Sequence, residues 1–335
     1  MINVRWMMAA VIGAAALAGV AACTGPGQAT GQKLSRQPKA PPPVPPMKAE
    51  PRDEALSVLA TKELLAAAKS DSPLLRAHAM EAIKLANLRQ GYPAIISGMD
   101  DPAGLVRFSA CMAAGELRIP QARESAKRLL QDPYETVRLG AIYLLHRQGD
   151  SQYTHTLERT AVSPDMQIRA NTAMVLGMLG EPSAQKILSV MLRDSSPAVR
   201  LQAAEAMWRL RDRDALEYLI TATISRYPDD QMIACLALAG PRDQGVIEHL
   251  RGMLVTPYTE VNLVTARALG MVGSDEGYGT ALAALPSPDA RQRQLAAMAF
   301  GAIGRMDAQR HLRKLLTDAE ADVRLAAAGA ILQLN

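Results

Sequence analysis

The five histidines are the side chains best suited to metal binding or to general acid–base catalysis. They are His78, His146, His155, His249 and His311. They are scattered along the chain, and no His-Glu dipeptide, which could place an imidazole and a carboxylate on one metal, occurs anywhere. We therefore predict no metal site and no cofactor, and we interpret these histidines as surface or groove residues.

Gly149-Asp150-Ser151 is the one short run that could present a serine nucleophile. A nucleophile of that type needs a sharp turn between a strand and a helix. This run instead falls in a loop between two helical stretches. The chain also lacks a glycine-rich phosphate loop and a clear pair of catalytic carboxylates. We predict no catalytic residue, so binding is the default function.

Cys23 is a candidate for covalent modification. Residues 1–22 combine a basic residue, an apolar stretch and small residues, as export signals do. The run Val20-Ala21-Ala22-Cys23 resembles the lipobox of bacterial lipoprotein signal peptides, in which the cysteine is lipidated and becomes the first residue of the mature chain. An ordinary secretory signal with an incidental cysteine is the alternative. The resemblance implies export and a lipid anchor, at the outer membrane if the cell has one, because threonine rather than aspartate follows the cysteine.

Residues 23–52 have the composition of a linker. They include eight prolines and almost no apolar side chains that could form a core. We predict that this segment is disordered and that a folded domain occupies residues 53–335. The basic residues of the linker could lie against anionic lipid or cell-wall polymer, or could simply keep a spacer soluble.

The charge of the folded domain excludes a general role in nucleic-acid binding. The whole chain has a formal net charge of +4, but residues 53–335 contain 31 basic and 32 acidic groups. Phosphate binding needs clustered Lys and Arg.

Hydrophobic residues make up 49% of the chain and aromatic residues only 4%. Together with abundant alanine, this composition favours closely packed helices.

A polar anchor position recurs every 31 residues along the folded domain. It is occupied by Arg76, Arg107, Arg138, Arg169, Arg200, Gln231, Asn262, Arg293 and Arg324. Six residues before each anchor stands Ser, Thr or Asp, and small residues, larger apolar residues and glycines follow it at helical spacing. Units of this size must stack on one another to bury a core. The pattern predicts an all-α, right-handed and elongated solenoid of about nine helical hairpins, each anchor pairing with turn oxygens of its own or the adjacent repeat.

The runs 194–207 and 318–331 resemble the short HEAT-like repeats, including those of phycobilisome-lyase type, and the resemblance spans about residues 53–335. It implies the fold and no single activity. Related hydroxylases hold iron with His-Glu pairs, which are absent here, and HEAT-like DNA glycosylases have a basic concave face. Bilin lyases act on cytoplasmic antenna proteins, so that activity does not suit an exported chain.

The second helix of each hairpin has unexpectedly apolar positions on the side opposite its core contacts. In HEAT-like solenoids this side usually lines the concave face, so these residues would form a methionine-rich groove for a protein or peptide partner. Packing between neighbouring second helices is the alternative. The predicted partner-binding residues are Met112, Tyr143, Met174, Met178, Ile233, Leu236, Val264, Met271, Leu295 and Met298.

Two adjacent repeats depart from the pattern. Gln231 and Asn262 replace the anchor arginine, and Tyr227 and Tyr258 share one register, where they could stack. This stretch could be a hinge or a partner site, or it could reflect drift in a tolerant solenoid.

Together these features predict a non-catalytic, lipid-anchored, protein-binding scaffold of the bacterial cell envelope. The alternative is an enzyme or accessory subunit of unrecognised chemistry.

Cys111 and Cys235 occupy the same position in repeats that lie four repeats apart. This separation is too large for a disulfide, so both should be buried free thiols.

Overall fold

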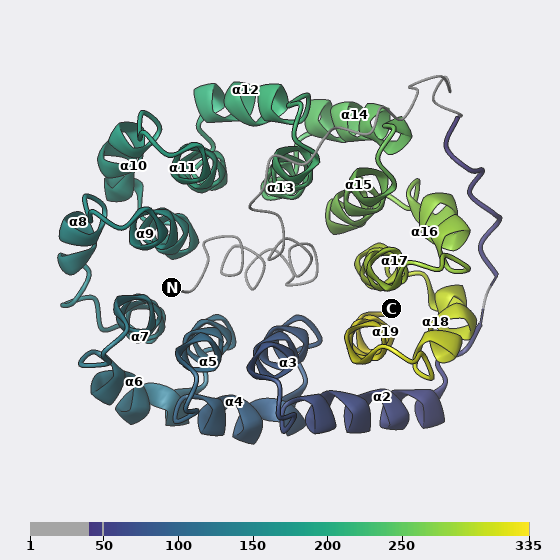
Figure 1. Cartoon of the computed structure of the whole chain (residues 1–335), viewed down its shortest axis with the longest axis horizontal. Coiled ribbons are helices and arrows are strands. Elements are labelled where there is room, and N and C mark those ends of the chain that lie inside the picture. Colours follow the sequence, from purple (N-terminus) through teal and green to yellow (C-terminus); the bar gives the residue numbers. More distant parts are fainter. Residues whose placement is uncertain (1–39, 49, 335) are drawn as a thin grey trace, which may run out of the picture.

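The computed structural model describes residues 40–48 and 50–334, and this part of the chain contains helices and no strands. The helices form nine hairpins, each with an outer and an inner helix (Figure 1). The outer helices are α2 (Glu54–Ala67), α4 (Tyr92–Gly98), α6 (Arg123–Leu129), α8 (Thr156–Thr160), α10 (Gln185–Met191), α12 (Arg213–Ala222), α14 (Gln244–Gly252), α16 (Tyr278–Ala284) and α18 (Gln309–Leu315). The inner helices are α3 (Pro73–Leu85), α5 (Gly104–Glu116), α7 (Glu135–Arg147), α9 (Met166–Leu179), α11 (Pro197–Arg209), α13 (Pro228–Leu238), α15 (Thr259–Met271), α17 (Ala290–Ile303) and α19 (Ala321–Gln333).

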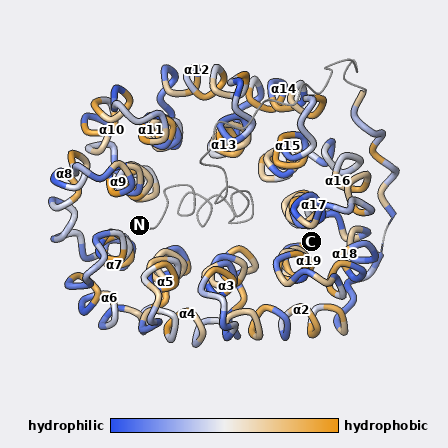
Figure 2. The backbone as a smooth tube through the Cα atoms, viewed as in Figure 1, coloured by the Kyte–Doolittle hydropathy of each residue, from blue (hydrophilic) through white to orange (hydrophobic). Residues whose placement is uncertain are grey.

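The two layers have the amphipathic pattern that a stacked solenoid needs. Hydrophobic and hydrophilic residues are interleaved along the helices of both layers (Figure 2). The buried apolar residues form one continuous core cluster that runs from Leu56 in α2 to Leu334. This architecture confirms the predicted all-α, right-handed solenoid of nine repeats.

The prediction of an elongated solenoid is wrong, because the nine hairpins close into a ring (Figure 1). Helix α19 packs against both α2 and α3, so the last repeat contacts the first. Each repeat of a solenoid is rotated slightly relative to its neighbour, and here the rotations add up to one full turn. The inner helices line the ring, as expected for the second helix of each hairpin.

Polar contacts join the two ends of the repeat domain. Arg324 Nε lies 2.9 Å from Glu63 Oε1, and Arg52 Nη1 donates to the Leu334 carbonyl at 3.2 Å. Arg313 also pairs with Asp53, the residue whose side chain caps α2 by accepting from the Leu56 N–H. The closure therefore combines an apolar helix interface with ion pairs.

The anchor arginines form a ladder that links each repeat to the next. In α9, Arg169 Nη1 donates to the Ser163 carbonyl of its own turn at 2.7 Å, while Nε and Nη2 bind the Asp194 carboxylate of the next repeat at 2.6 and 2.8 Å. These hydrogen bonds lower the pKa of Asp194 and raise that of Arg169. The same pairing is made by Arg76 with Asp101, Arg107 with Asp132, and Arg293 with Asp318. The predicted pairing with turn oxygens of the same and the adjacent repeat is confirmed.

Glycines eight residues after the anchor allow neighbouring inner helices to approach closely. A Cβ at Gly177 would lie 2.6 Å from Ala206 Cα, and a Cβ at Gly270 would lie 2.6 Å from the Ile303 nitrogen. Trp208 occupies the equivalent position in α11, where its Nε1–H donates to the Leu238 carbonyl of α13 at 3.1 Å. Helices α11 and α13 are therefore joined through an indole ring.

Residues 40–48 contact the outer layer beside α16 and α18, where the sequence predicted a disordered linker (Figure 1). Arg305 Nη1 donates to the Pro45 carbonyl at 3.0 Å, and the Lys48 N–H donates to Asp307 Oδ2 at 3.3 Å. A Cβ at Gly279 would clash with the Pro42 carbonyl. The predicted disorder is therefore wrong for this part, because the Pro45 carbonyl and the Lys48 N–H bind the buried side chains of Arg305 and Asp307.

The predicted signal peptide (1–22), Cys23 and the first part of the linker lie outside the described residues. Within the described part, no helix has the length and apolar character needed to cross a membrane.

Candidate ligand-binding site inside the ring

The predicted methionine-rich groove is largely covered by neighbouring inner helices. Six of its residues are at most 8% exposed, namely Met112, Tyr143, Met174, Leu236, Val264 and Leu295. Met178, Ile233 and Met298 are half-buried, and Met271 is 51% exposed. The expected open groove is therefore wrong for six positions. The physical reason is the close helix spacing: Tyr143 of α7, for example, packs directly over Gly115 of α5.

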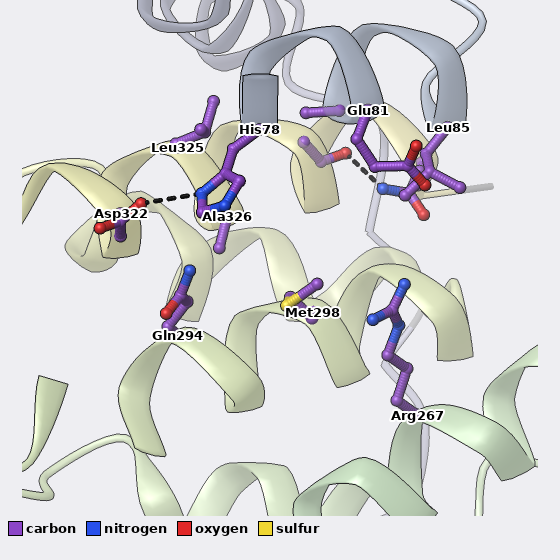
Figure 3. Close-up of a pocket in the computed structure, with 12 residues that line it drawn as sticks. His78, Glu81, Leu85, Arg267, Gln294, Met298, Asp322, Leu325 and Ala326 are labelled. Atoms are coloured by element: carbon purple, nitrogen blue, oxygen red, sulfur yellow. Dashed lines mark hydrogen bonds and ion pairs between the residues drawn. The ribbon is translucent and has the colours of Figure 1, made fainter. Parts of the chain in front are cut away.

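A pocket remains on the inner side of the ring, where the first repeat meets the last. Its lining comes from α3, α15, α17 and α19, and it is a small hollow of about 60 Å³ that is partly open to solvent. The close-up shows His78 and Glu81 reaching in from α3, Met298 and Gln294 from α17, and Arg267 from α15 (Figure 3). The pocket exists because the ring closes, since α3 and α19 lie at opposite ends of the sequence.

His78 and Asp322 pair across the closure. His78 Nδ1 lies 3.1 Å from Asp322 Oδ1, and the two residues are 244 positions apart in the sequence (Figure 3). His78 is 7% exposed, and its buried Nε2 has no hydrogen-bond partner among the described residues. A carboxylate on one ring nitrogen orients the imidazole and sets the role of the other nitrogen. The Asp322 carboxylate therefore fixes the orientation of the His78 imidazole in the pocket wall and leaves Nε2 without a partner among the described residues.

Glu81 and Arg267 place opposite charges in the pocket wall. Glu81 Oε2 pairs with Lys84 Nζ at 2.8 Å, one turn further along α3. Arg267 is 8% exposed. Burial lowers the pKa of its guanidinium, while the Glu81 carboxylate acts in the opposite direction. A cation in such a poorly solvated position interacts strongly with polar groups that enter the pocket.

Apolar side chains complete the pocket wall. Leu85, Met298 and Leu325 line it beside the polar groups, and Leu85 is 41% exposed. The ionisable side chains among the lining residues are His78, Glu81, Arg267 and Asp322. Apolar surface with a few convergent polar groups is the usual composition of a ligand pocket. The arrangement is suited to binding an amphipathic group, and Met298 is the one predicted partner-binding residue that it includes.

The sequence contains one local signal for this pocket. Glu81 and Arg267 occupy the fifth position after their anchors, where most other repeats have an apolar residue, whereas His78 stands at the second position, which is often polar. Polar residues at such positions indicate a local function or a local partner. Asp322 could not be assigned to them, because only ring closure brings the last repeat beside the first.

Of the other histidines, His146 and His155 line a separate hollow with Ser151 and Glu181, and His146 Nε2 lies 3.4 Å from Glu181 Oε1. His249 Nε2 lies 2.8 Å from Thr223 Oγ1, and burial lowers the pKa of His249. His311 stacks on Phe300 at 5.9 Å between ring centroids. No group of three or more His, Cys, Asp and Glu that could hold a metal is found in residues 40–48 and 50–334. Asp150, from the possible serine-nucleophile run, pairs with Arg123 at 3.0 Å.

The two cysteines of the repeat domain are buried and free, as predicted. Burial strongly raises the pKa of Cys111 and raises that of Cys235 to about 11, so both thiols stay protonated and inert at neutral pH.

Tyr227 and Tyr258 are 53% and 38% exposed. The predicted stacking between these tyrosines is not seen, because the Tyr227 ring instead lies 4.7 Å from the Arg226 guanidinium carbon.

Comparison with known proteins places this architecture in a family. No curated protein matches the chain. Among solved structures, the complex of CpcE and CpcF of phycocyanin lyase from Nostoc sp. PCC7120 is 19% identical, with a TM-score of 0.45, over 71% of this chain and 97% of that one. Human deoxyhypusine hydroxylase in complex with glycerol is 18% identical, with a TM-score of 0.37, over 84% of this chain and 96% of that one. The model of the HEAT repeats family matches residues 61–146, 153–239 and 184–270, which together make up more than half of the sequence. The chain therefore belongs to the HEAT-repeat family.

Proposed function

We propose that this chain is a non-catalytic binding protein that is anchored by a lipid on Cys23 to the bacterial cell envelope and binds a protein or peptide segment inside its ring. The observation that supports binding is the pocket at the ring closure, where the orphan His78 Nε2 and the Arg267 guanidinium line the wall beside Leu85 and Met298. A short peptide segment offers the combination of backbone polar groups and apolar side chains that such a wall fits.

The ring restricts how a partner can reach the pocket. The lining helices are all inner helices, so a ligand must enter the ring interior rather than dock on the outer layer (Figure 1). A flexible loop or an extended terminus can enter such a space, whereas a folded domain has to present a protruding segment. We therefore infer that the bound element is a peptide segment of a larger envelope protein.

The anchor is tested by fractionating cells that produce the wild-type chain or Cys23→Ser. We expect the wild-type protein to remain with membranes until detergent is added, because an acylated cysteine partitions into the bilayer. The variant should lose lipid incorporation, measured by labelling with a radioactive fatty acid, and should no longer be extracted as a mature lipoprotein. Equal labelling of both proteins would contradict lipidation at this position.

The binding site is tested by site-specific photo-crosslinking in intact cells. A photoreactive amino acid at Leu85, which is exposed in the pocket, should give a discrete adduct with one envelope protein. The matched control is Val190, which is 68% exposed on the outer helix α10. Adding Met298→Asp should remove the Leu85 adduct while circular dichroism stays unchanged. The same adducts from Leu85 and Val190, or no adduct from Leu85, would contradict binding in the ring interior.

A further inference from the structure

Among the residues that the structure describes, Arg200 is the one ladder arginine whose guanidinium fork forms no ion pair with a carboxylate. Its Nη1 donates to the carbonyls of Asp194 and Ser195 at 2.7 and 3.1 Å, as its counterparts do in their own turns. In four other repeats the Nε and Nη2 atoms bind the aspartate that begins the next repeat's turn. Ser225 occupies that position opposite Arg200. Nε and Nη2 of Arg200 thus have no ion-pair partner among the described residues.

Arg138 is an instructive comparison, because it also faces a serine, Ser163, in the next repeat. There, Glu135 lies one turn earlier on α7, and its Oε1 is 3.3 Å from Arg138 Nη2. The corresponding position before Arg200 is Pro197, which supplies no charge. The fork of Arg200 is therefore available for a carboxylate that comes from outside the chain.

A pocket lies at this point of the ladder. It has a volume of about 240 Å³, is partly open to solvent, and is lined by Arg200 and Leu201 of α11, Tyr218 of α12, and Ser225 and Asp230 of the following repeat. Ser225 Oγ donates to Asp230 Oδ2 at 2.9 Å and accepts from the Tyr227 N–H at 3.2 Å. The turn is therefore capped without an aspartate, and the arginine, an aromatic ring and a carboxylate border one hollow.

We propose that this pocket binds a peptide through a carboxylate group, which Nε and Nη2 of Arg200 receive in the two-pronged geometry of the ladder pairs. Parallel N–H···O bonds from arginine match the two oxygens of a carboxylate. Tyr218 and Leu201 offer apolar contact to the neighbouring side chain of the ligand. Asp230 favours ligands with N–H donors beside the carboxylate and disfavours phosphate and other polyanions. This site is separate from the pocket in the ring interior, so a test of carboxylate binding at Arg200 is independent of the tests of the proposed function.

The carboxylate could be the C-terminus of a peptide or an acidic side chain, and two probes separate these sources. The first is acetyl-alanyl-alanine with a free C-terminus, compared with its amide. The second is the amide of acetyl-aspartate, compared with the amide of acetyl-asparagine. The readout is the ¹⁵Nε–H signal of Arg200 in the full-length chain in detergent micelles, assigned by its absence in Arg200→Gln. Glutamine at this position should keep the fold, because Gln231 naturally makes the same bond to its own turn, at 2.6 Å to the Ser225 carbonyl.

We expect one carboxylate probe to shift the Arg200 signal to saturation, while its uncharged partner and inorganic phosphate do not. The Arg169 signal should not move, because Asp194 already occupies its fork.

The decisive variant is Ser225→Asp, which recreates the ladder pair within the chain. It should raise the melting temperature and weaken binding of the probe by at least about tenfold. Asp230→Asn should retain binding, since it removes a repelling charge.

Two results would overturn the proposal. One is an Arg200 signal that no carboxylate probe shifts. The other is equal probe binding by the wild-type chain and by a folded Ser225→Asp variant.

Discussion

Replacing Arg107 with glutamine should lower the free energy of unfolding by about 3–5 kcal/mol, because it leaves a buried carboxylate without its cation. Arg107 and Asp132 form the most enclosed ladder pair, with side chains 11% and 4% exposed and Nε–Oδ2 and Nη2–Oδ1 distances of 2.7 and 2.9 Å. The glutamine can still bond its own turn, as Gln231 does. The loss should be measured by urea denaturation followed by circular dichroism.

Arg138→Gln is the matched control for this substitution. Arg138 has the same bond to its own turn, at 2.7 Å to the Asp132 carbonyl, but its only ion pair among the described residues is with Glu135, and both side chains are about one-third exposed. Because an exposed pair is well solvated, its loss should cost only about 0.2–1 kcal/mol. If both substitutions cost the same, the ladder carboxylates do not stabilise the ring in the manner described.

Replacing Trp208 with alanine should also destabilise the ring by about 3–5 kcal/mol, because it opens a large cavity between α11 and α13. Trp208 is 1% exposed and stands where four other inner helices, α5, α9, α15 and α17, have glycine. Its neighbours cannot collapse into the gap without moving one repeat against the next. The measurement is again the free energy of unfolding, together with hydrogen exchange of the α13 amides, which should become faster.

Trp208→Phe separates the volume of the indole from its hydrogen bond. Phenylalanine keeps most of the ring contact but leaves the Leu238 carbonyl without its 3.1 Å donor, so we expect a loss of about 1–3 kcal/mol. Equal losses in the alanine and phenylalanine variants would show that the hydrogen bond, and not the volume, joins these repeats.

The repeat unit could be predicted from the sequence because every signal for it is local. An anchor, a capping residue and a small residue recur within 31 positions, and each hairpin is built from these contacts. Ring closure could not be predicted in this way. It depends on a small rotation between neighbours that accumulates over nine repeats, and no single residue encodes its sum.

The same difference explains what was right and wrong about the candidate site. The predicted stripe lies on the inner helices, but the exposure of each of its residues depends on the distance to the next inner helix. That distance is set by glycines such as Gly115 and Gly177. His78 and Asp322 meet only in the closed ring, so the sequence gives no local sign of their pairing.

Ring closure also gives the first and the last repeat a packed neighbour on both sides. In an open array the terminal repeats have one neighbour each, fray first and need special polar caps. Here Glu63 of the first hairpin gives Arg324 of the last one a carboxylate in place of the aspartate that a tenth repeat would supply. Every hairpin thus has a neighbour on both sides. The backbone has two termini, but the stack of repeats has no terminal repeat. A circular permutant whose new termini lie in any outer turn would therefore keep the same set of interfaces between repeats.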